Sequence, residues 1–123
     1  METFKYKKYE NCYFVVSNYM KSKNAVAIMI CNDYDGQIST CTTYIDEYVS
    51  KDLATIKNYS ENSKMTDFLQ ELGIIKEIVY RFPCNAYPET LASLQTDNPQ
   101  TIDICTIDFE KLKEHSKVFK RNA

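Results

Sequence analysis

The dipeptide Asp35-Gly36, which separates two runs of β-favouring residues, constrains the fold of this chain more than any other feature. A two-residue type I′ turn needs positive φ at both positions, which glycine adopts freely and aspartate tolerates. We therefore expect residues 25–31 and 37–45 to form an antiparallel hairpin with Ile30 opposite Cys41. This register gives the hairpin one apolar face. The face comprises Val26, Ile28, Ile30, Cys41, Thr43 and Ile45.

Further β-favouring segments predict the remaining strands. They span residues 12–19, 53–59, 74–82 and 102–107. Alternation places Ile78, Tyr80 and Phe82 together on one side of the third of these segments. The segment 83–100 contains all three prolines, so we expect mostly loop there, with a short edge strand around residues 90–94.

Two segments have helical patterns. The first, residues 64–72, follows a capping pair, Asn62-Ser63, and precedes Gly73 at the C′ position. Its apolar residues recur at helical spacing, at Met65, Phe68, Leu69 and Leu72. Asp108 is expected to cap a terminal helix whose apolar residues are Phe109, Leu112 and Phe119. Together these elements predict the α+β class, an antiparallel β-sheet with one or two helices packed on one face.

Charged residues are distributed unevenly along the chain, although the net charge is only −2. Residues 1–23 carry a net +3 and residues 111–123 a net +4, whereas residues 24–110 carry −9. Two domains would each bury too small a core in a chain of 123 residues. We therefore expect a single domain, 1–123, with a basic N-terminal arm (about residues 1–10) and a basic C-terminal helix and tail (about residues 109–123).

Few residues are suited to catalysis or to binding a cofactor. Two glycines are too few for a glycine-rich phosphate loop, and the segment Asn32–Gly36 lacks the spacing of a calcium loop. We expect the single histidine, His115, on the polar side of the terminal helix. Our expectation is a protein without enzymatic activity, cofactor or metal. A hydrolase with a cysteine nucleophile and His115 as its base is the third hypothesis, after the two binding functions given below.

The five cysteines are odd in number and form no Cys-x-x-Cys pair, so we expect reduced thiols and no disulfide framework. Strand patterns predict that Cys12, Cys41 and Cys105 are buried, whereas we expect Cys31 and Cys84 to be exposed. The sequence contains neither a secretory signal pattern nor an apolar run of the roughly 18 residues that span a bilayer. We therefore expect a cytoplasmic protein without a membrane partner.

Acidic and aromatic residues at both ends of the predicted hairpin are the candidate partner-binding residues. Those at the turn are Asp33, Tyr34 and Asp35. Those that follow the second strand of the hairpin, residues 37–45, are Asp46, Glu47, Tyr48 and Asp52. Carboxylates steer a basic partner toward the surface, and tyrosine supplies a large contact area with a polar tip. We favour the second group, where the acids could take the positions of phosphate groups on a basic protein surface.

The start of the chain offers an alternative. Aromatic residues alternate there with cations, in the order Phe4, Lys5, Tyr6, Lys7, Lys8, Tyr9. Rings interleaved with cations are typical of proteins that hold single-stranded nucleic acid. The segment is short and terminal, so we rank a protein interface ahead of a nucleic-acid interface.

Five segments, residues 12–19, 24–28, 58–62, 68–74 and 107–112, occur in an order that resembles a domain-of-unknown-function family. Its members are small accessory proteins from conjugative elements and phages of Gram-positive bacteria. The resemblance implies an accessory protein of a mobile element, and such proteins include antirestriction and anti-CRISPR inhibitors, which bind without catalysis. The function expected from it is inhibition of a host defence nuclease, of the Cas9 type, with or without its guide RNA. The alternative is a nucleic-acid-binding accessory factor that uses the basic ends, and the chain could also form a homodimer.

Overall fold

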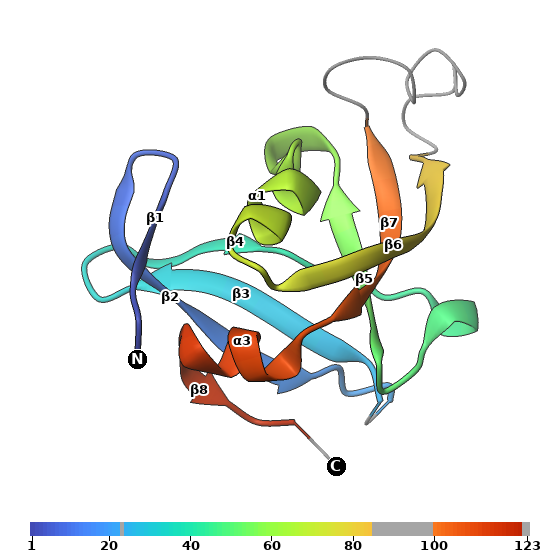
Figure 1. Ribbon diagram of the computed structural model, residues 1–123, viewed down its shortest axis with the longest axis horizontal. Helices are drawn as coiled ribbons and strands as arrows, with labels where there is room; N and C mark the ends of the chain where they lie inside the picture. Colours follow the sequence, from blue (N-terminus) through green and yellow to red (C-terminus); the bar gives the residue numbers. More distant parts are fainter. Residues whose placement is uncertain (23, 85–99, 122–123) are drawn as a thin grey trace.

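The computed structural model describes residues 1–22, 24–84 and 100–121. These residues form two β-sheets and two short helices, so the predicted α+β class is confirmed (Figure 1). The larger sheet comprises β1 (Phe4–Tyr6), β2 (Tyr9–Asn18), β3 (Val26–Asn32), β4 (Gly36–Thr40) and β8 (Ser116–Phe119). The smaller sheet comprises β5 (Leu53–Asn58), β6 (Ile75–Pro83) and β7 (Thr101–Ile107), with β7 in the centre. The helices are α1 (Met65–Glu71) and α3 (Phe109–Glu114), and two single 3₁₀ turns are η1 (Asp46–Tyr48) and η2 (Ser60–Asn62).

Both ends of the chain belong to the larger sheet. Its order is β1-β2-β3-β4, and β8 lies parallel to β2 on the edge opposite β3. Residues 4–6 and the start of β2 are paired strands, so the basic segment that we expected as an arm, about residues 1–10, is part of the larger sheet. Asp108 does cap α3, since its Oδ1 accepts a hydrogen bond from Lys111 N at 3.0 Å. However, α3 ends at Glu114, and Phe119, which we placed on this helix, lies in β8.

The β3–β4 hairpin forms, but its turn differs from the predicted one. Asn32 pairs with Gly36, so the loop contains three residues, and Gly36 takes a left-handed conformation with φ 76°. The Asn32 side chain accepts a hydrogen bond from the backbone N–H of Asp35, which favours this longer loop over a two-residue turn. Continued from this loop without a break, the ladder would place Ile30 opposite Ile38, but its register shifts between Ile30 and Cys31. Ile30 therefore lies opposite Ser39 and not opposite Cys41. A shift of two residues keeps the same face inward, and Cys41 is still fully buried.

The second strand of the hairpin, predicted for residues 37–45, is β4 and ends at Thr40. It ends there because the chain then crosses to the smaller sheet. Thr42 forms a bridge with Ile56, Lys57 N donates to Cys41 O at 2.8 Å, and Thr43 N donates to Thr55 O at 3.0 Å. Residues 41–43 thus join the two sheets by backbone hydrogen bonds. The core is one cluster to which both sheets, α1 and α3 contribute.

Helix α1 is positioned by side chains from outside the helix. The predicted cap at Asn62-Ser63 is wrong, because the N-cap residue is Lys64, at φ 69°. The Lys64 side chain forms no capping hydrogen bond with the helix. The backbone N–H of Thr66 instead donates to Asn58 Oδ1 on β5 at 2.9 Å. Gly73, with φ 80°, ends the helix as predicted.

The sequence also predicts that this helix covers the apolar face of the hairpin through Phe68 and Leu69. The helix packs mainly against β5 and β6, with Leu69 fully buried. The Phe68 ring meets β1 instead, with its centroid 5.0 Å from that of Tyr6 and 5.7 Å from that of Phe4. The helix therefore bridges the smaller sheet and the N-terminal strand of the larger one.

Strand β6 departs from the predicted alternation. Its pairing with β7 shifts register twice, between Ile75 and Glu77 and between Ile78 and Tyr80. Each irregularity turns the following side chains to the other face, so Tyr80, expected toward the core, is 58% exposed. The predicted edge strand around residues 90–94 lies outside the described residues.

A buried carboxylate links β6, β7 and α1. Asp103 is fully buried in the middle of β7, where its oxygens accept two hydrogen bonds from the Arg81 guanidinium, both at 2.9 Å. The Thr66 hydroxyl donates a third bond to Oδ2 at 2.6 Å. Burial of an ionised carboxylate is tolerated only where hydrogen bonds and a counter-charge replace its hydration.

We predict that Arg81→Met destabilises the protein by about 3 kcal/mol, because the variant leaves the Asp103 carboxylate buried without its cation. The measurement is the midpoint of urea unfolding. Lys76→Met, at an exposed position of the same strand, is the matched control and should change the stability by less than about 0.5 kcal/mol. Equal midpoints for the two variants would contradict this role of the ion pair.

Candidate functional site

The predicted partner-binding residues lie at two separate places. The turn residues 33–35 lie at the tip of the β3–β4 hairpin, whereas Asp46, Glu47 and Tyr48 form η1 on the opposite side of the molecule (Figure 1). The structure therefore does not bring the two groups together. Each group has its own surroundings and is considered separately.

The acids at the hairpin tip are engaged within the protein. Asp33 Oδ1 accepts hydrogen bonds from the Tyr13 hydroxyl at 2.8 Å and from Lys117 Nζ at 2.9 Å. The bond from Lys117 is the main reason why the pKa of Asp33 is lowered, and the bond from Tyr13 adds to the effect. Asp35 Oδ2 accepts from the Asn32 side chain at 3.0 Å. Tyr34, in contrast, is 95% exposed and extends into solvent.

The acids around η1 have a different environment. Asp46, Glu47 and Asp52 are exposed, and no lysine or arginine of the described ranges lies within ion-pair distance of their carboxylates. The Tyr44 hydroxyl donates to Asp46 Oδ1 at 2.7 Å, and this bond raises the pKa of Tyr44. These three carboxylates are therefore available to a positively charged partner.

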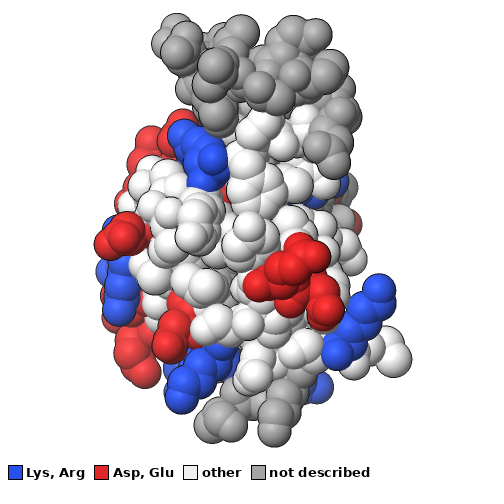
Figure 2. All heavy atoms as spheres, turned by 90° about the vertical axis from the view of Figure 1, so that its right-hand side faces the viewer, with Lys and Arg blue, Asp and Glu red and all other residues white. Residues whose placement is uncertain are grey.

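An aromatic cluster lies directly beside these acids. The half-buried ring of Tyr48 has its centroid 5.8 Å from that of Tyr80 and 5.7 Å from that of Phe82. A hollow of about 340 Å³ opens next to them, lined by Ile45, Glu47, Tyr48, Phe82, Pro83 and Ile102. Figure 2, which looks onto this side of the molecule, shows acidic side chains gathered beside an uncharged area. We call Asp46, Glu47, Asp52 and these aromatic residues the η1 surface.

Sequence reasoning missed Tyr80 and Phe82 as part of this surface, because the alternation of 74–82 placed both toward the core. The register shifts of β6 bring the two rings to Tyr48 instead. An exposed aromatic at an edge strand is typical of interfaces, but the exposure of Tyr80 and the edge position of β6 are features of the structure and not of the sequence. The pattern alone could not show where β6 is irregular.

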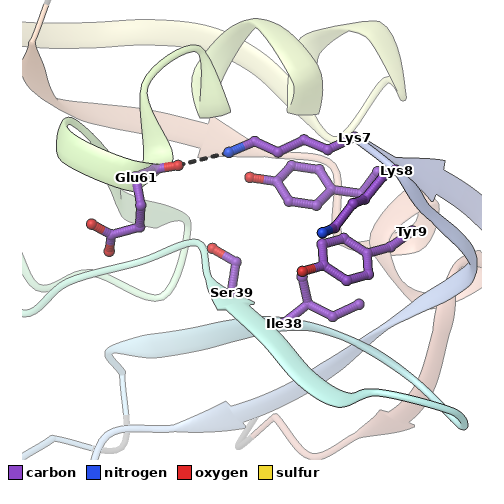
Figure 3. A pocket seen from close by; sticks show the side chains of 7 residues that line it. Lys7, Lys8, Tyr9, Ile38, Ser39 and Glu61 are labelled. Atoms are coloured by element: carbon purple, nitrogen blue, oxygen red, sulfur yellow. Dashed lines mark hydrogen bonds between the residues drawn. The ribbon is translucent and has the colours of Figure 1, made fainter.

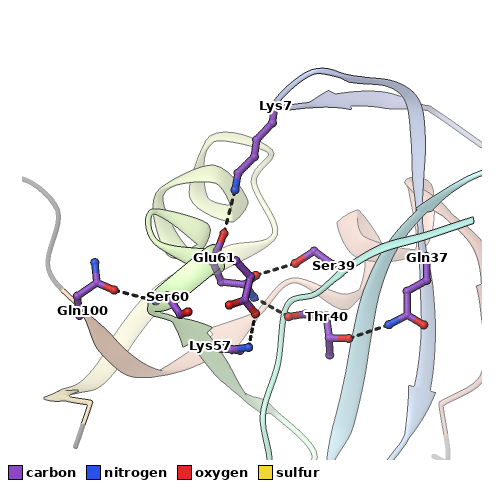
Figure 4. Close-up of polar contacts among 9 residues, drawn as sticks. Lys7, Gln37, Ser39, Thr40, Lys57, Ser60, Glu61 and Gln100 are labelled. Atoms are coloured by element: carbon purple, nitrogen blue, oxygen red, sulfur yellow. Dashed lines mark hydrogen bonds and ion pairs between the residues drawn. The ribbon is translucent and has the colours of Figure 1, made fainter. Parts of the chain in front are cut away.

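A second concave site lies between the β1–β2 turn and β4. This groove, of about 390 Å³, is lined by Tyr6, Lys7, Lys8, Tyr9, Ile38, Ser39 and Glu61 (Figure 3). Polar contacts hold its walls together: Lys7 Nζ donates to Glu61 O at 2.9 Å, Ser39 Oγ donates to Asn62 Oδ1 at 2.7 Å, and the Glu61 carboxylate pairs with Lys57 (Figure 4). We call it the β1–β2 groove. The alternation of rings and cations near the start of the chain was its only signal in the sequence.

The residues required by the hydrolase hypothesis are buried. His115, expected on the polar side of a helix, is 8% exposed, and its Nδ1 lies 2.9 Å from the backbone oxygen of Glu2. Cys12, Cys41 and Cys105 are fully buried as predicted, but Cys31 and Cys84 are buried as well, which corrects their expected exposure. Burial raises the pKa of the Cys41 thiol and raises that of Cys105 to about 12, so neither thiol readily forms a thiolate.

Comparisons with known proteins give no assignment: no family model matches the sequence, and neither a curated protein nor a solved structure is significantly similar to it. Within the described part of the chain, no group of three or more potential ligand side chains is arranged to hold a metal ion. None of the helices described here has the length and apolar character needed to cross a bilayer. The candidate sites are therefore judged by their geometry and charge.

For the hairpin tip, we predict that Lys117→Ala raises the pKa of Asp33 toward its ordinary value of about 3.9. Carboxyl-carbon NMR shifts followed from neutral to acidic pH measure it. Because this pKa is lower in the folded than in the unfolded chain, the contact stabilises the fold above the unfolded pKa. That stabilisation is lost as the pH falls through the folded pKa. Lys120→Ala is the control and should leave the Asp33 titration unchanged; an unchanged titration in both variants would contradict the pairing.

For the thiols, we predict slow reaction of Cys41 and Cys105 with a disulfide reagent in the native protein. Both side chains are fully buried, so the reaction waits for local opening. Peptide mapping after timed labelling measures each site, and labelling in denaturant gives the reference rate. If either thiol reacted as fast in the native protein as in denaturant, its burial would be disproved and the hydrolase hypothesis would regain weight.

Proposed function

We propose that this protein is a non-enzymatic inhibitor that binds a basic protein partner through the η1 surface. The observation that carries the proposal is the set of three exposed carboxylates around η1, none of which has a cation of the described residues within ion-pair distance. One of them, that of Glu47, lines the same hollow as Tyr48 and Phe82, whose rings form a cluster with that of Tyr80. Carboxylates of this kind steer association, and desolvated aromatic anchors supply most of the short-range affinity. The hollow at Ile45 and Pro83 would receive an apolar side chain of the partner.

The partner class that we propose is a guide-loaded defence nuclease of the Cas9 type, in the bacterial cytoplasm. This choice rests on the family resemblance of the sequence segments. A nuclease of this kind holds its heteroduplex in a basic channel that contacts the phosphate backbone. Asp46, Glu47 and Asp52 would occupy positions that phosphates otherwise take. The hairpin tip is left out of this contact, because Asp33 is already neutralised by Lys117.

Ion pairs at the basic ends favour this function over nucleic-acid binding by the ends as a whole. Lys5 pairs with Glu10, Lys111 with Glu114 and Lys117 with Asp33. Glu10 and Glu114 are already included in the net charges of +3 and +4, whereas Asp33 comes from the acidic middle of the chain. The Lys117–Asp33 pair therefore lowers the positive charge of the C-terminal end.

The first experiment is a pull-down with the tagged protein against a panel of purified Cas effectors, with and without guide RNA. Capture of one effector identifies the partner, and its dependence on guide RNA shows whether the loaded channel is required. Capture of none of them would contradict the proposed partner class.

For the captured partner, we predict that the double variant Asp46→Lys/Glu47→Lys weakens binding at least about tenfold at low salt, mainly by slowing association. The matched control is Glu71→Lys/Glu110→Lys, which changes the net charge equally at two other exposed positions. Surface plasmon resonance at two salt concentrations measures both rates. Equal loss in the two double variants would indicate that only net charge matters, and a requirement for Lys120 with dispensable acids would favour nucleic-acid binding.

A further inference from the structure

The β1–β2 groove carries positive charge in a protein whose net charge is negative. Lys7 and Lys8 are exposed on its rim, and neither has a carboxylate of the described residues within ion-pair distance. Lys7 Nζ bonds the backbone oxygen of Glu61, not its carboxylate. That carboxylate is paired with Lys57, and this contact lowers the pKa of Glu61 to about 2. The carboxylate is therefore ionised, and the ammonium group of Lys57 balances its negative charge. The two ammonium groups therefore favour an anion.

Aromatic and apolar side chains form the floor between these cations and β4. The half-buried ring of Tyr9 and the side chain of Ile38 face the groove together with the Ser39 hydroxyl (Figure 3). The Tyr6 ring below them is fixed by an edge contact with Phe68. A flat group can lie against Tyr9 and Ile38. The Ser39 hydroxyl donates its proton to Asn62 Oδ1, so it can only accept a hydrogen bond from this group.

The groove is formed before any ligand arrives. Its two walls, the β1–β2 turn and the η2 segment, are joined by the bond from Lys7 to Glu61 O, and Asn62 Nδ2 ties η2 to Thr40 O on β4 at 2.6 Å (Figure 4). Lys8 Nζ lies 5.5 Å from the centroid of the Tyr9 ring. An exposed contact of that kind is weak, so Lys8 can turn from the ring to a bound anion at little cost.

We propose that the β1–β2 groove binds a nucleotide unit, with the phosphate at Lys7 and Lys8 and the base against Tyr9 and Ile38. Phosphate and base together match the groove's pairing of cations with an aromatic floor. The unit can belong to a single-stranded nucleic acid or to a free nucleotide. This site shares no residue with the η1 surface, so the two proposals stand or fall independently.

The test is fluorescence anisotropy of a labelled oligothymidylate about eight nucleotides long, in about 50 mM salt, with the full chain. We expect Lys8→Glu to weaken binding at least about tenfold. Lys113→Glu is the matched control, since Lys113 is also exposed and also lies over a ring, that of Phe119, on another part of the molecule. It should change the affinity less than about twofold. Lys8→Gln, which has the size of the Glu variant but only removes the charge, should give an intermediate loss and guards against a folding defect of Lys8→Glu.

A second comparison tests the base. Tyr9→Leu should weaken binding of the oligothymidylate at least about fivefold and leave binding of an abasic strand of equal length unchanged. Competition then separates the sources: displacement by a mononucleotide indicates a free nucleotide, and displacement by oligonucleotides alone indicates a strand. Lack of binding at millimolar protein, equal effects of Lys8→Glu and Lys113→Glu, or stronger displacement by a polyglutamate peptide than by unlabelled oligothymidylate would each overturn the proposal.

Discussion

The hydrogen-bonded pairing of Asp103 with Arg81 is the interaction on which the arrangement of the smaller sheet and α1 depends. Asp103 lies on the central strand of that sheet, and its three side-chain bonds reach β6 through Arg81 and α1 through Thr66. A buried carboxylate cannot be left without these donors, so strand and helix can occupy only positions that supply them. Asn58 adds to this from the other side by accepting the first-turn N–H of α1. The helix is thus fixed by the sheet and not by a local cap.

The same arrangement positions both candidate sites. Because α1 is held on the smaller sheet, Phe68 reaches Tyr6 and supports the floor of the β1–β2 groove. Because Arg81 must point to Asp103, its neighbours Tyr80 and Phe82 take the places beside Tyr48 that form the η1 surface. A binding site on a small domain needs such support, since a contact that is loose by an ångström loses most of its selectivity. Neither site depends on a catalytic group.

Local signals in the sequence predicted local structure well. Gly73 and Asp108 mark the end of one helix and the start of another, as expected from backbone freedom and capping. Features that depend on distant partners were not predictable. Strand β8 is four residues long and forms because β2 offers a free edge, and the helix cap comes from Asn58 on β5. The hairpin register differs by two residues from the predicted one because the Asn32 side chain favours a three-residue loop and because the ladder is irregular between Ile30 and Cys31. Asp35-Gly36 alone decides neither feature.

The candidate sites show the same division between local and distant effects. Exposure of Asp46, Glu47 and Asp52 followed from their position outside the strands, but the availability of their charge depends on the fact that no cation of the described residues forms an ion pair with them. Asp33 is equally exposed, yet Lys117, distant in the sequence, neutralises it. Net charge also conceals the two sites, because a total of −2 includes an acidic η1 surface and a basic groove on different sides of the molecule (Figure 1). Since salt screens exposed charges beyond about 8–10 Å, a ligand responds to the local charge of the surface that it contacts and not to the total.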